Sequence, residues 1–244
     1  MNRLYPKTRY GTKYGGYYYP ETFPIVPQRI LSFGAGEDIS HDVHLAHVTG
    51  AVVHIFDPTP RALAHIGLVK QVLDGKAEAV NDDKYGGGDV DYWNIIKENA
   101  CTPELLRMYN TGIYTRDDSL TFYFPQNGDH VSGSLVPNEK SPSQLQVQVK
   151  CLRTICNELG WGECGPDILK LDVEGVECEV LQQMITETYY RPMYIAVDFD
   201  SARSGLEGLK KATATCDMLY KEGYYSYHFD NWDMTFVRRD ISMS

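Results

Sequence analysis

The sequence predicts an α/β fold: a mostly parallel sheet with helices on both faces. Short apolar runs alternate with helical stretches from about residue 29 to residue 240, and this alternation is typical of parallel strands joined by helices. Two segments near the C-terminus flank Asn231-Trp232, which predicts an antiparallel hairpin at one edge of the sheet. We expect one domain over 29–244, preceded by a Tyr-rich extension over 1–28.

The predicted strands are short apolar runs bounded by turn residues, at 29–33, 51–56, 108–114, 120–124, 144–151, 168–171, 194–197, 224–229 and 234–238. The run 144–151 alternates polar and apolar residues, which is the period of a strand with one buried face. Predicted helices cover 40–48, 59–73, 92–98, 152–159, a stretch from Gly175, and 206–222. Thr59 followed by Pro60 is typical of an N-cap and first helical turn.

The composition argues against several classes of binding partner and cellular location. The 244 residues include 23 Lys and Arg against 33 Asp and Glu, a net charge of −10, so a nucleic-acid partner or an anionic membrane surface is not expected. The sequence has no run of about 20 apolar residues, which a membrane span needs, and its polar N-terminus is not expected to be a secretory signal. The six cysteines form no C-x-x-C pair, which favours reduced thiols and a cytoplasmic location.

The first predicted strand ends in the glycine-rich turn Phe33-Gly34-Ala35-Gly36-Glu37-Asp38. Glycines at this position let a ligand approach the backbone in the crevice beyond the strand. Asp57 follows the second strand about 20 residues later, where an acid can accept hydrogen bonds from ribose hydroxyls. The candidate cofactor-binding residues are Phe33, Gly34, Ala35, Gly36, Asp38, Asp57, Pro58 and Asp172.

The charge of this turn distinguishes two kinds of cofactor. A dinucleotide places a pyrophosphate against bare N–H groups at a helix N-terminus, whereas this turn carries the two acids Glu37 and Asp38 and lacks a third glycine. S-adenosylmethionine has no phosphate, and its sulfonium and amino groups are cationic. The sequence therefore favours S-adenosylmethionine over a dinucleotide.

Charged residues also stand in or directly after two later strands. Lys170 and Asp172 alternate with apolar residues in the strand at 168–171, so they share one face and either pair or serve a site. Asp198 and Asp200 follow the next strand. Asp172, Asp198 and Asp200 are a candidate site for Mg²⁺ or Mn²⁺, and the alternative is a carboxylate acting as general base. Asp172, Asp198 and Lys170 are the candidate catalytic residues.

Polar residues in two further segments are candidates for contact with the substrate. His130, Ser132 and Ser134 lie in one polar loop, and His228 lies in the predicted C-terminal hairpin. Aromatic and hydroxyl-bearing side chains of this kind suit a sugar, although packing is the ordinary role of most of the 18 tyrosines.

Several of these segments together resemble the FkbM family of S-adenosylmethionine-dependent methyltransferases. They are ILSFGAGEDISHDVHLA (30–46), FDPTPRA (56–62), NTGIY with LTFYFP (110–125), HVSGSLVP (130–137) and DILKLDVEGVECEVL (167–181). The resemblance implies a Rossmann-like sheet of seven strands, a cofactor on Gly34, Gly36, Asp38 and Asp57, and a reaction near Asp172. Many members carry Glu-x-His after the fifth strand, where this chain has Asp198-Phe199-Asp200.

The expected function is therefore O-methylation of a hydroxyl of a sugar or glycan. Two alternatives stay open at this point. One is an NAD-dependent sugar oxidoreductase or epimerase, which needs an uncharged phosphate-binding turn. The other is a non-catalytic module that binds adenosine or a glycan without turnover. The sequence also leaves open whether the protein is a monomer or a homodimer.

Overall fold

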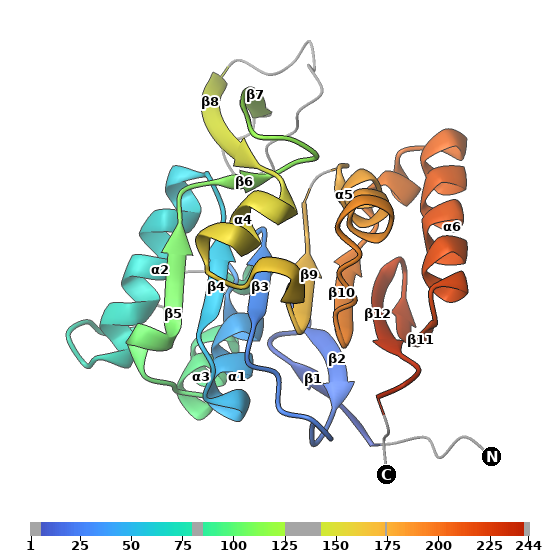
Figure 1. Ribbon diagram of the computed structural model, residues 1–244. Coiled ribbons are helices and arrows are strands. Elements are labelled where there is room, and N and C mark those ends of the chain that lie inside the picture. Colours follow the sequence, from blue (N-terminus) through green and yellow to red (C-terminus); the bar gives the residue numbers. More distant parts are fainter. Residues whose placement is uncertain (1–5, 80–84, 125–142, 174, 242–244) are drawn as a thin grey trace.

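The computed structural model describes residues 6–79, 85–124, 143–173 and 175–241. Its centre is a sheet of seven strands in the order β11-β12-β10-β9-β3-β4-β5 (Figure 1). The strands are β3 (Ile30–Phe33), β4 (Val53–Phe56), β5 (Leu106–Tyr109), β9 (Ile168–Leu171), β10 (Tyr194–Asp198), β11 (Tyr224–Asp230) and β12 (Asp233–Arg238). From β5 to β10 all neighbours are parallel, and β12 is antiparallel to both β10 and β11. The predicted fold class is confirmed.

Helices cover both faces of this sheet, because its strands are apolar on both sides. In β3, Ile30 belongs to one core cluster and Leu31 to the other. The first cluster includes residues of α1 (Ser40–Thr49), α2 (Pro60–Leu73) and α3 (Tyr92–Glu98). The second includes residues of α4 (Leu152–Glu158), α5 (Glu177–Gln183) and α6 (Leu206–Lys221). Short helical turns are η1 (Tyr85–Gly88), η2 (Pro103–Leu105), η3 (Gly162–Cys164), η4 (Met184–Thr188) and η5 (Asp200–Arg203).

The segment predicted as one strand over 108–114 is divided in two. It forms the end of β5 and the short strand β6 (Gly112–Ile113), and the amide of Thr111 donates to the carbonyl of Tyr109 between them (2.9 Å). This tight turn takes the chain out of the main sheet. β6 then joins β8 (Ser143–Lys150) and β7 (Asp118–Phe124) in a separate sheet that projects above the carboxyl ends of the parallel strands (Figure 1).

The Tyr-rich N-terminal segment contains two strands that the sequence analysis does not predict. β1 (Lys7–Tyr10) and β2 (Tyr17–Pro20) form an antiparallel hairpin. Tyr10, Tyr17 and Tyr19 are buried in the core cluster that the hairpin shares with α1 and the main sheet, whereas Tyr18 is only partly buried. The hairpin therefore packs against the sheet as part of the same hydrophobic core.

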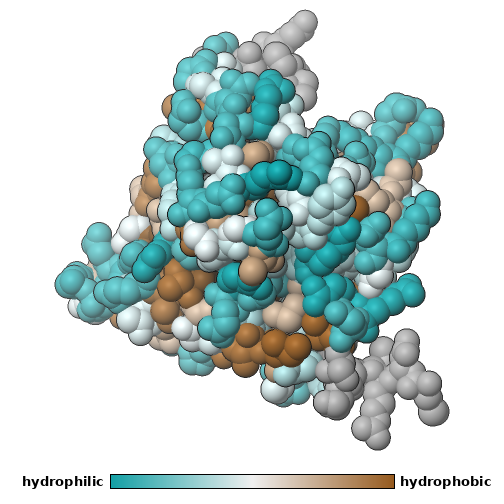
Figure 2. Space-filling view, in the orientation of Figure 1, coloured by the Kyte–Doolittle hydropathy of each residue, from teal (hydrophilic) through white to brown (hydrophobic). Residues whose placement is uncertain are grey.

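Polar residues cover most of the surface seen in Figure 2, and hydrophobic residues gather towards its lower part. Among the described helices, none is long and apolar enough to cross a membrane. The six cysteines Cys101, Cys151, Cys156, Cys164, Cys178 and Cys216 are free thiols in this structure.

Candidate functional site

The strand order of the sheet reverses between the neighbouring strands β3 and β9. The chain passes from β3 to β4 on one side and from β9 to β10 on the other, and a ligand crevice is expected at the carboxyl ends of strands at such a point. Phe33 and Leu171 are register partners at the ends of these two strands. The glycine-rich turn and Asp172, both candidate cofactor-binding elements, therefore begin side by side.

The backbone of Gly34 lies so close to Asp172, directly after the neighbouring strand β9, that there is no room for a side chain. Its φ is +79°, and a Cβ built on it would lie 1.8 Å from the carbonyl oxygen of Asp172. The amide of Asp172 donates to the carbonyl of Phe33 (3.0 Å). Gly36 differs, because its φ is +50° but a Cβ there would meet no atom within 4 Å. The turn is therefore closely packed at Gly34 and open at Gly36.

Asp57 holds the turn from the neighbouring strand. One carboxylate oxygen accepts hydrogen bonds from the amides of Ala35 (2.9 Å) and Gly36 (3.0 Å). The other accepts from the amide (2.8 Å) and hydroxyl (2.6 Å) of Thr59. Four donors match the lone-pair capacity of a carboxylate, so Asp57 determines the shape of the turn. Contact between Asp57 and a ribose stays a prediction.

Replacing Asp57 by Ala will destabilise the fold. The substitution leaves the amides of Ala35 and Gly36 without their acceptor, and each orphaned buried donor costs about 1–3 kcal/mol. We expect the free energy of unfolding in urea to fall by about 2–4 kcal/mol. Glu207→Ala, which removes an exposed carboxylate, is the control. A loss no larger than that of the control would contradict this account of the turn.

Asp38 and Glu37 make the turn acidic while bonding to the chain. Asp38 accepts from the amide (2.9 Å) and hydroxyl (2.6 Å) of Ser40 and from the hydroxyl of Thr12 (2.5 Å). Glu37 pairs with Arg61 at 2.6 Å. Asp38 thus connects the turn both to α1 and to the N-terminal hairpin.

The two remaining candidate cofactor-binding residues are Phe33, which lies beneath the turn, and Pro58, which lies beside it. Phe33 is fully buried, and its ring stacks on that of Phe56 with centroids 5.0 Å apart. Only its backbone therefore reaches the turn. Pro58 is partly exposed and lies against Gly112.

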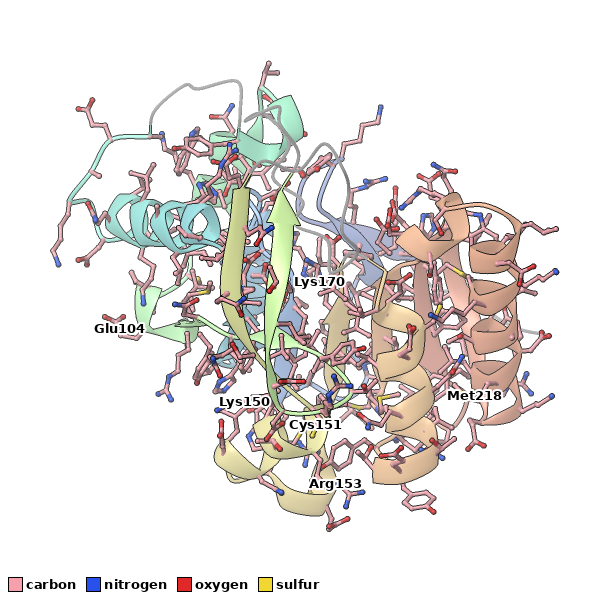
Figure 3. The ribbon with its side chains drawn as sticks, turned by 90° about the horizontal axis from the view of Figure 1, so that it is seen from above. Glu104, Lys150, Cys151, Arg153, Lys170 and Met218 are labelled. Atoms are coloured by element: carbon pink, nitrogen blue, oxygen red, sulfur yellow. The ribbon has the colours of Figure 1, made fainter. Side chains whose placement is uncertain are left out.

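Lys170 lies under the turn, near the middle of the molecule when viewed from above (Figure 3). Its ammonium donates to the carbonyl of Gly34 and pairs with Asp172 at 3.1 Å. Burial opposes the charge, but Asp172, Asp42 and Asp38 outweigh it and raise the pKa of Lys170. Lys170 therefore stays charged and holds the turn and Asp172 together, as the shared face of Lys170 and Asp172 predicts.

The second group of charges lies at the ends of β10 and β12. Asp198 is the register partner of Asp233, and both interact electrostatically with Asp172. We call Asp172, Asp198 and Asp233 the carboxylate cluster. Burial, Asp172 and Asp233 raise the pKa of Asp198 to about 7. Burial and Asp172 likewise raise the pKa of Asp233. A carboxyl group with a pKa near neutrality is suited to general-base catalysis.

Arg203, in η5, limits the repulsion within the cluster. Its guanidinium lies 2.5 Å from Asp198 and 3.6 Å from Asp233, and it donates to the carbonyl of Asn231 (2.8 Å). Sequence reasoning missed both Arg203 and Asp233. The predicted hairpin around Asn231-Trp232 could have located Asp233 opposite the end of β10, whereas the short helical turn that positions Arg203 left no sequence signal.

The predicted metal site is not found. β10 ends at Asp198 and the chain enters η5 at Asp200, so the strand alternation that would place both side chains on one face does not continue. Asp200 interacts instead with Glu177 and Arg203. Within the described ranges, no group of three or more His, Cys, Asp or Glu side chains could hold a metal ion. A carboxylate that acts as general base stays a prediction.

Of the four candidate substrate residues, His130, Ser132 and Ser134 lie outside the described residues. His228 lies on β11 against the N-terminal hairpin. Its Nδ1 atom is 3.2 Å from the ammonium of Lys7, and its ring is 3.9 Å from that of Tyr18. These contacts are on the outer side of the hairpin, away from the buried side that Tyr17 and Tyr19 present to the sheet.

A cavity of about 460 Å³ lies elsewhere, between β4, β5 and the end of α4. Its wall includes His54, Tyr109 and Trp161, and burial together with Arg107 lowers the pKa of His54 to about 4. Neither the glycine-rich turn nor the carboxylate cluster contributes to its lining.

The chain was compared with known proteins. No protein-family model matches the chain, and no curated protein matches it. The chain is similar to the crystal structure of methyltransferase FkbM from Methylobacillus flagellatus KT, with a TM-score of 0.47 and 13% sequence identity. The match covers 86% of this chain and 43% of the other, so this chain spans less than half of that protein's length. The sequence motifs resemble the family of the same name.

Proposed function

We propose that the protein is an S-adenosylmethionine-dependent O-methyltransferase that acts on a hydroxyl of a sugar or glycan in the cytoplasm. The observation that carries this proposal is the position of Asp198. Its pKa is raised to about 7 within a carboxylate cluster that begins at Asp172, directly beside the glycine-rich turn. A methyl donor bound at the turn would then lie next to a group able to deprotonate an alcohol.

The residues of the turn suit a donor that is cationic and carries no phosphate. Asp57 already occupies the amides of Ala35 and Gly36, so these groups are not free to bind a pyrophosphate. The open space above Gly36 leaves room for a ligand against the backbone. The side chain of Asp172 is 43% exposed and supplies negative charge towards a cation. When bound, S-adenosylmethionine supplies a methyl group activated by the sulfonium.

The chain contributes alignment and proton removal. Asp198 accepts the proton of the acceptor hydroxyl, and Arg203 holds Asp198 in place through their 2.5 Å contact. Lys170 fixes Asp172 and the turn from below, so it is a positioning residue. Holding the two reactants in line supplies much of the rate enhancement in a displacement of this kind.

The occupied amides and the acids of the turn also weigh against the NAD-dependent alternative. Isothermal titration calorimetry with S-adenosylmethionine, S-adenosylhomocysteine and NAD separates the two. We expect both sulfur compounds to bind with micromolar dissociation constants and NAD not to bind. Binding of NAD without either sulfur compound would contradict the proposal. Binding of the sulfur compounds without methyl transfer to any hydroxyl would favour the non-catalytic module.

Chelation provides a separate prediction. Because Asp198 pairs with Arg203 and Asp172 pairs with Lys170, we expect methyl transfer to proceed at the same rate in the presence of excess EDTA. The measurement is radiometric methyl transfer with and without chelator. Loss of activity that Mg²⁺ or Mn²⁺ restores would show that the carboxylates act through a metal.

A further inference from the structure

The N-terminal hairpin is anchored on the glycine-rich turn. Its own turn, residues 11–16, places the hydroxyl of Thr12 2.5 Å from Asp38, and the amide of Thr12 donates to the hydroxyl of Ser40 (2.8 Å). A Cβ on Gly15 would lie 2.8 Å from the carboxylate of Asp38. β2 therefore begins, at Tyr17, beside the crevice.

Tyr17 differs from the other buried tyrosines of this hairpin. The hydroxyl of Tyr10 donates to the carbonyl of Pro20 (3.1 Å), and that of Tyr19 lies 3.0 Å from Nε2 of His41. Tyr17 is 5% exposed, yet its hydroxyl forms no hydrogen bond with any residue in the described ranges. The oxygen of this hydroxyl is not among the fully enclosed side-chain atoms of the described residues that lack a partner, so it is open to solvent. An accessible O–H at the edge of the crevice, without a partner in the chain, is a candidate contact for a ligand.

The surroundings of Tyr17 are rich in acceptors. Its hydroxyl interacts electrostatically with all three members of the carboxylate cluster, Asp172, Asp198 and Asp233. The charged donors nearby are already engaged, Lys170 by Gly34 and Asp172, and Arg203 by Asp198 and Asn231. Burial, followed by the three carboxylates, raises the pKa of Tyr17 well above its ordinary value. The phenol is therefore a neutral donor among anions.

A ligand that satisfies this arrangement must donate hydrogen bonds to carboxylates and accept one from a phenol. The reacting hydroxyl directs its proton to Asp198 and a lone pair to the methyl carbon, so a neighbouring hydroxyl is the group that can accept from Tyr17. We propose that Tyr17 is a substrate-binding residue whose O–H donates to an oxygen adjacent to the reacting hydroxyl, so that the acceptor is a vicinal diol. This inference rests on the proposed methyltransferase function.

The reaction balances with the groups present. The acceptor oxygen forms a bond to the methyl carbon, the carbon–sulfur bond of the donor breaks, and its electron pair returns to sulfur as a neutral thioether. The proton of the acceptor hydroxyl passes to Asp198. Tyr17 keeps its own proton and holds the second oxygen, so it sets orientation and specificity.

The experiment compares Tyr17→Phe with the neighbouring Tyr18→Phe, whose ring lies on the outer side of the hairpin against His228. Removing the Tyr17 oxygen breaks no hydrogen bond to the described residues, so the variant should keep the melting temperature of the wild type. Radiometric methyl transfer is measured with methyl α-D-glucopyranoside, methyl α-D-galactopyranoside and methyl α-L-rhamnopyranoside, and with monodeoxy counterparts of each.

We expect Tyr17→Phe to raise KM for a diol acceptor about fivefold to tenfold, the effect of losing one neutral hydrogen bond, with a smaller change in kcat. The difference from wild type should vanish for the counterpart that lacks the adjacent hydroxyl. Tyr18→Phe should have the KM of the wild type for each glycoside and for its deoxy counterpart. The dissociation constant of S-adenosylhomocysteine should be the same for all three proteins.

Three outcomes would overturn the inference. An unchanged KM in Tyr17→Phe would remove its role and leave the methyltransferase proposal intact. A wild-type protein that binds S-adenosylhomocysteine but methylates none of the glycosides would overturn the diol acceptor and leave the donor site. A wild-type protein that does not bind S-adenosylhomocysteine would overturn the inference together with the proposed function.

Discussion

Replacing Asp198 by Asn will lower kcat for methyl transfer by about 100-fold or more, the usual contribution of a general base. Asn keeps the size and polarity of Asp but cannot accept the proton of the acceptor hydroxyl. Donor binding should be unaffected, because Asp198 lies at the end of β10 and not in the glycine-rich turn. The measurements are single-turnover methyl transfer and the dissociation constant of S-adenosylhomocysteine.

The same substitution will stabilise the fold at neutral and higher pH. In the folded protein the pKa of Asp198 is raised from 3.8 to about 7, so between these values the folded state binds more protons than the unfolded state. The free energy of unfolding therefore falls as the pH rises from about 4 to about 7. Asn does not ionise, and we expect the variant to gain about 1–3 kcal/mol over the wild type at pH 8.

Urea unfolding at pH 5 and pH 8 tests this effect, with Asp217→Asn as the control because Asp217 is exposed on α6. The predicted pattern is a large loss of activity together with a gain of stability that grows with pH. A trade-off between activity and stability of this kind is common where an active site holds like charges together. A variant that retains activity would contradict the role of Asp198 as general base. A variant that loses stability at pH 8 would show that the ionised carboxylate stabilises the fold.

Replacing Gly34 by Ala will weaken donor binding more than any other single substitution in the turn. The added Cβ would lie 1.8 Å from the carbonyl of Asp172, at a φ of +79°, so β3 and β9 must separate at their carboxyl ends. We expect the dissociation constant of S-adenosylhomocysteine to rise at least about tenfold and the free energy of unfolding to fall by about 2–4 kcal/mol.

Gly36→Ala is the matched control, because its φ of +50° is also left-handed but its Cβ would meet no atom within 4 Å. It should lose only about 1–2 kcal/mol, the cost of that conformation in a residue other than glycine. Urea unfolding measures the stability of both variants. Equal losses of unfolding free energy at Gly34 and Gly36 would indicate that the backbone conformation determines the loss and that the approach of Asp172 does not.

The parts of the fold that depend on local pattern could be predicted from the sequence. Ile30 and Leu31 point to opposite faces of β3 and are both buried, which is why a continuous apolar run predicted a strand covered on two sides. The pairing of Lys170 with Asp172 follows from the period of a strand in the same way. Thr59 caps α2 through its side chain, as its place before Pro60 indicates.

The rest depends on contacts between distant segments. β1 and β2 lack a clear apolar alternation, and Tyr17 and Tyr19 are buried only because they pack against α1 and the main sheet. Asp233 joins Asp198 through the register of an antiparallel pair. Asp200 does not continue the strand alternation of Asp198, because β10 ends at Asp198 and Asp200 begins η5. None of these distances is encoded in the spacing along the chain.

The pH dependence of methyl transfer by the wild-type protein tests the central claim most directly. The account predicts that kcat rises about tenfold per pH unit below about pH 7 and reaches a plateau above it, because only ionised Asp198 accepts the proton of the hydroxyl. A rate that stays constant from pH 5 to pH 9, in a protein that binds S-adenosylhomocysteine throughout, would contradict it.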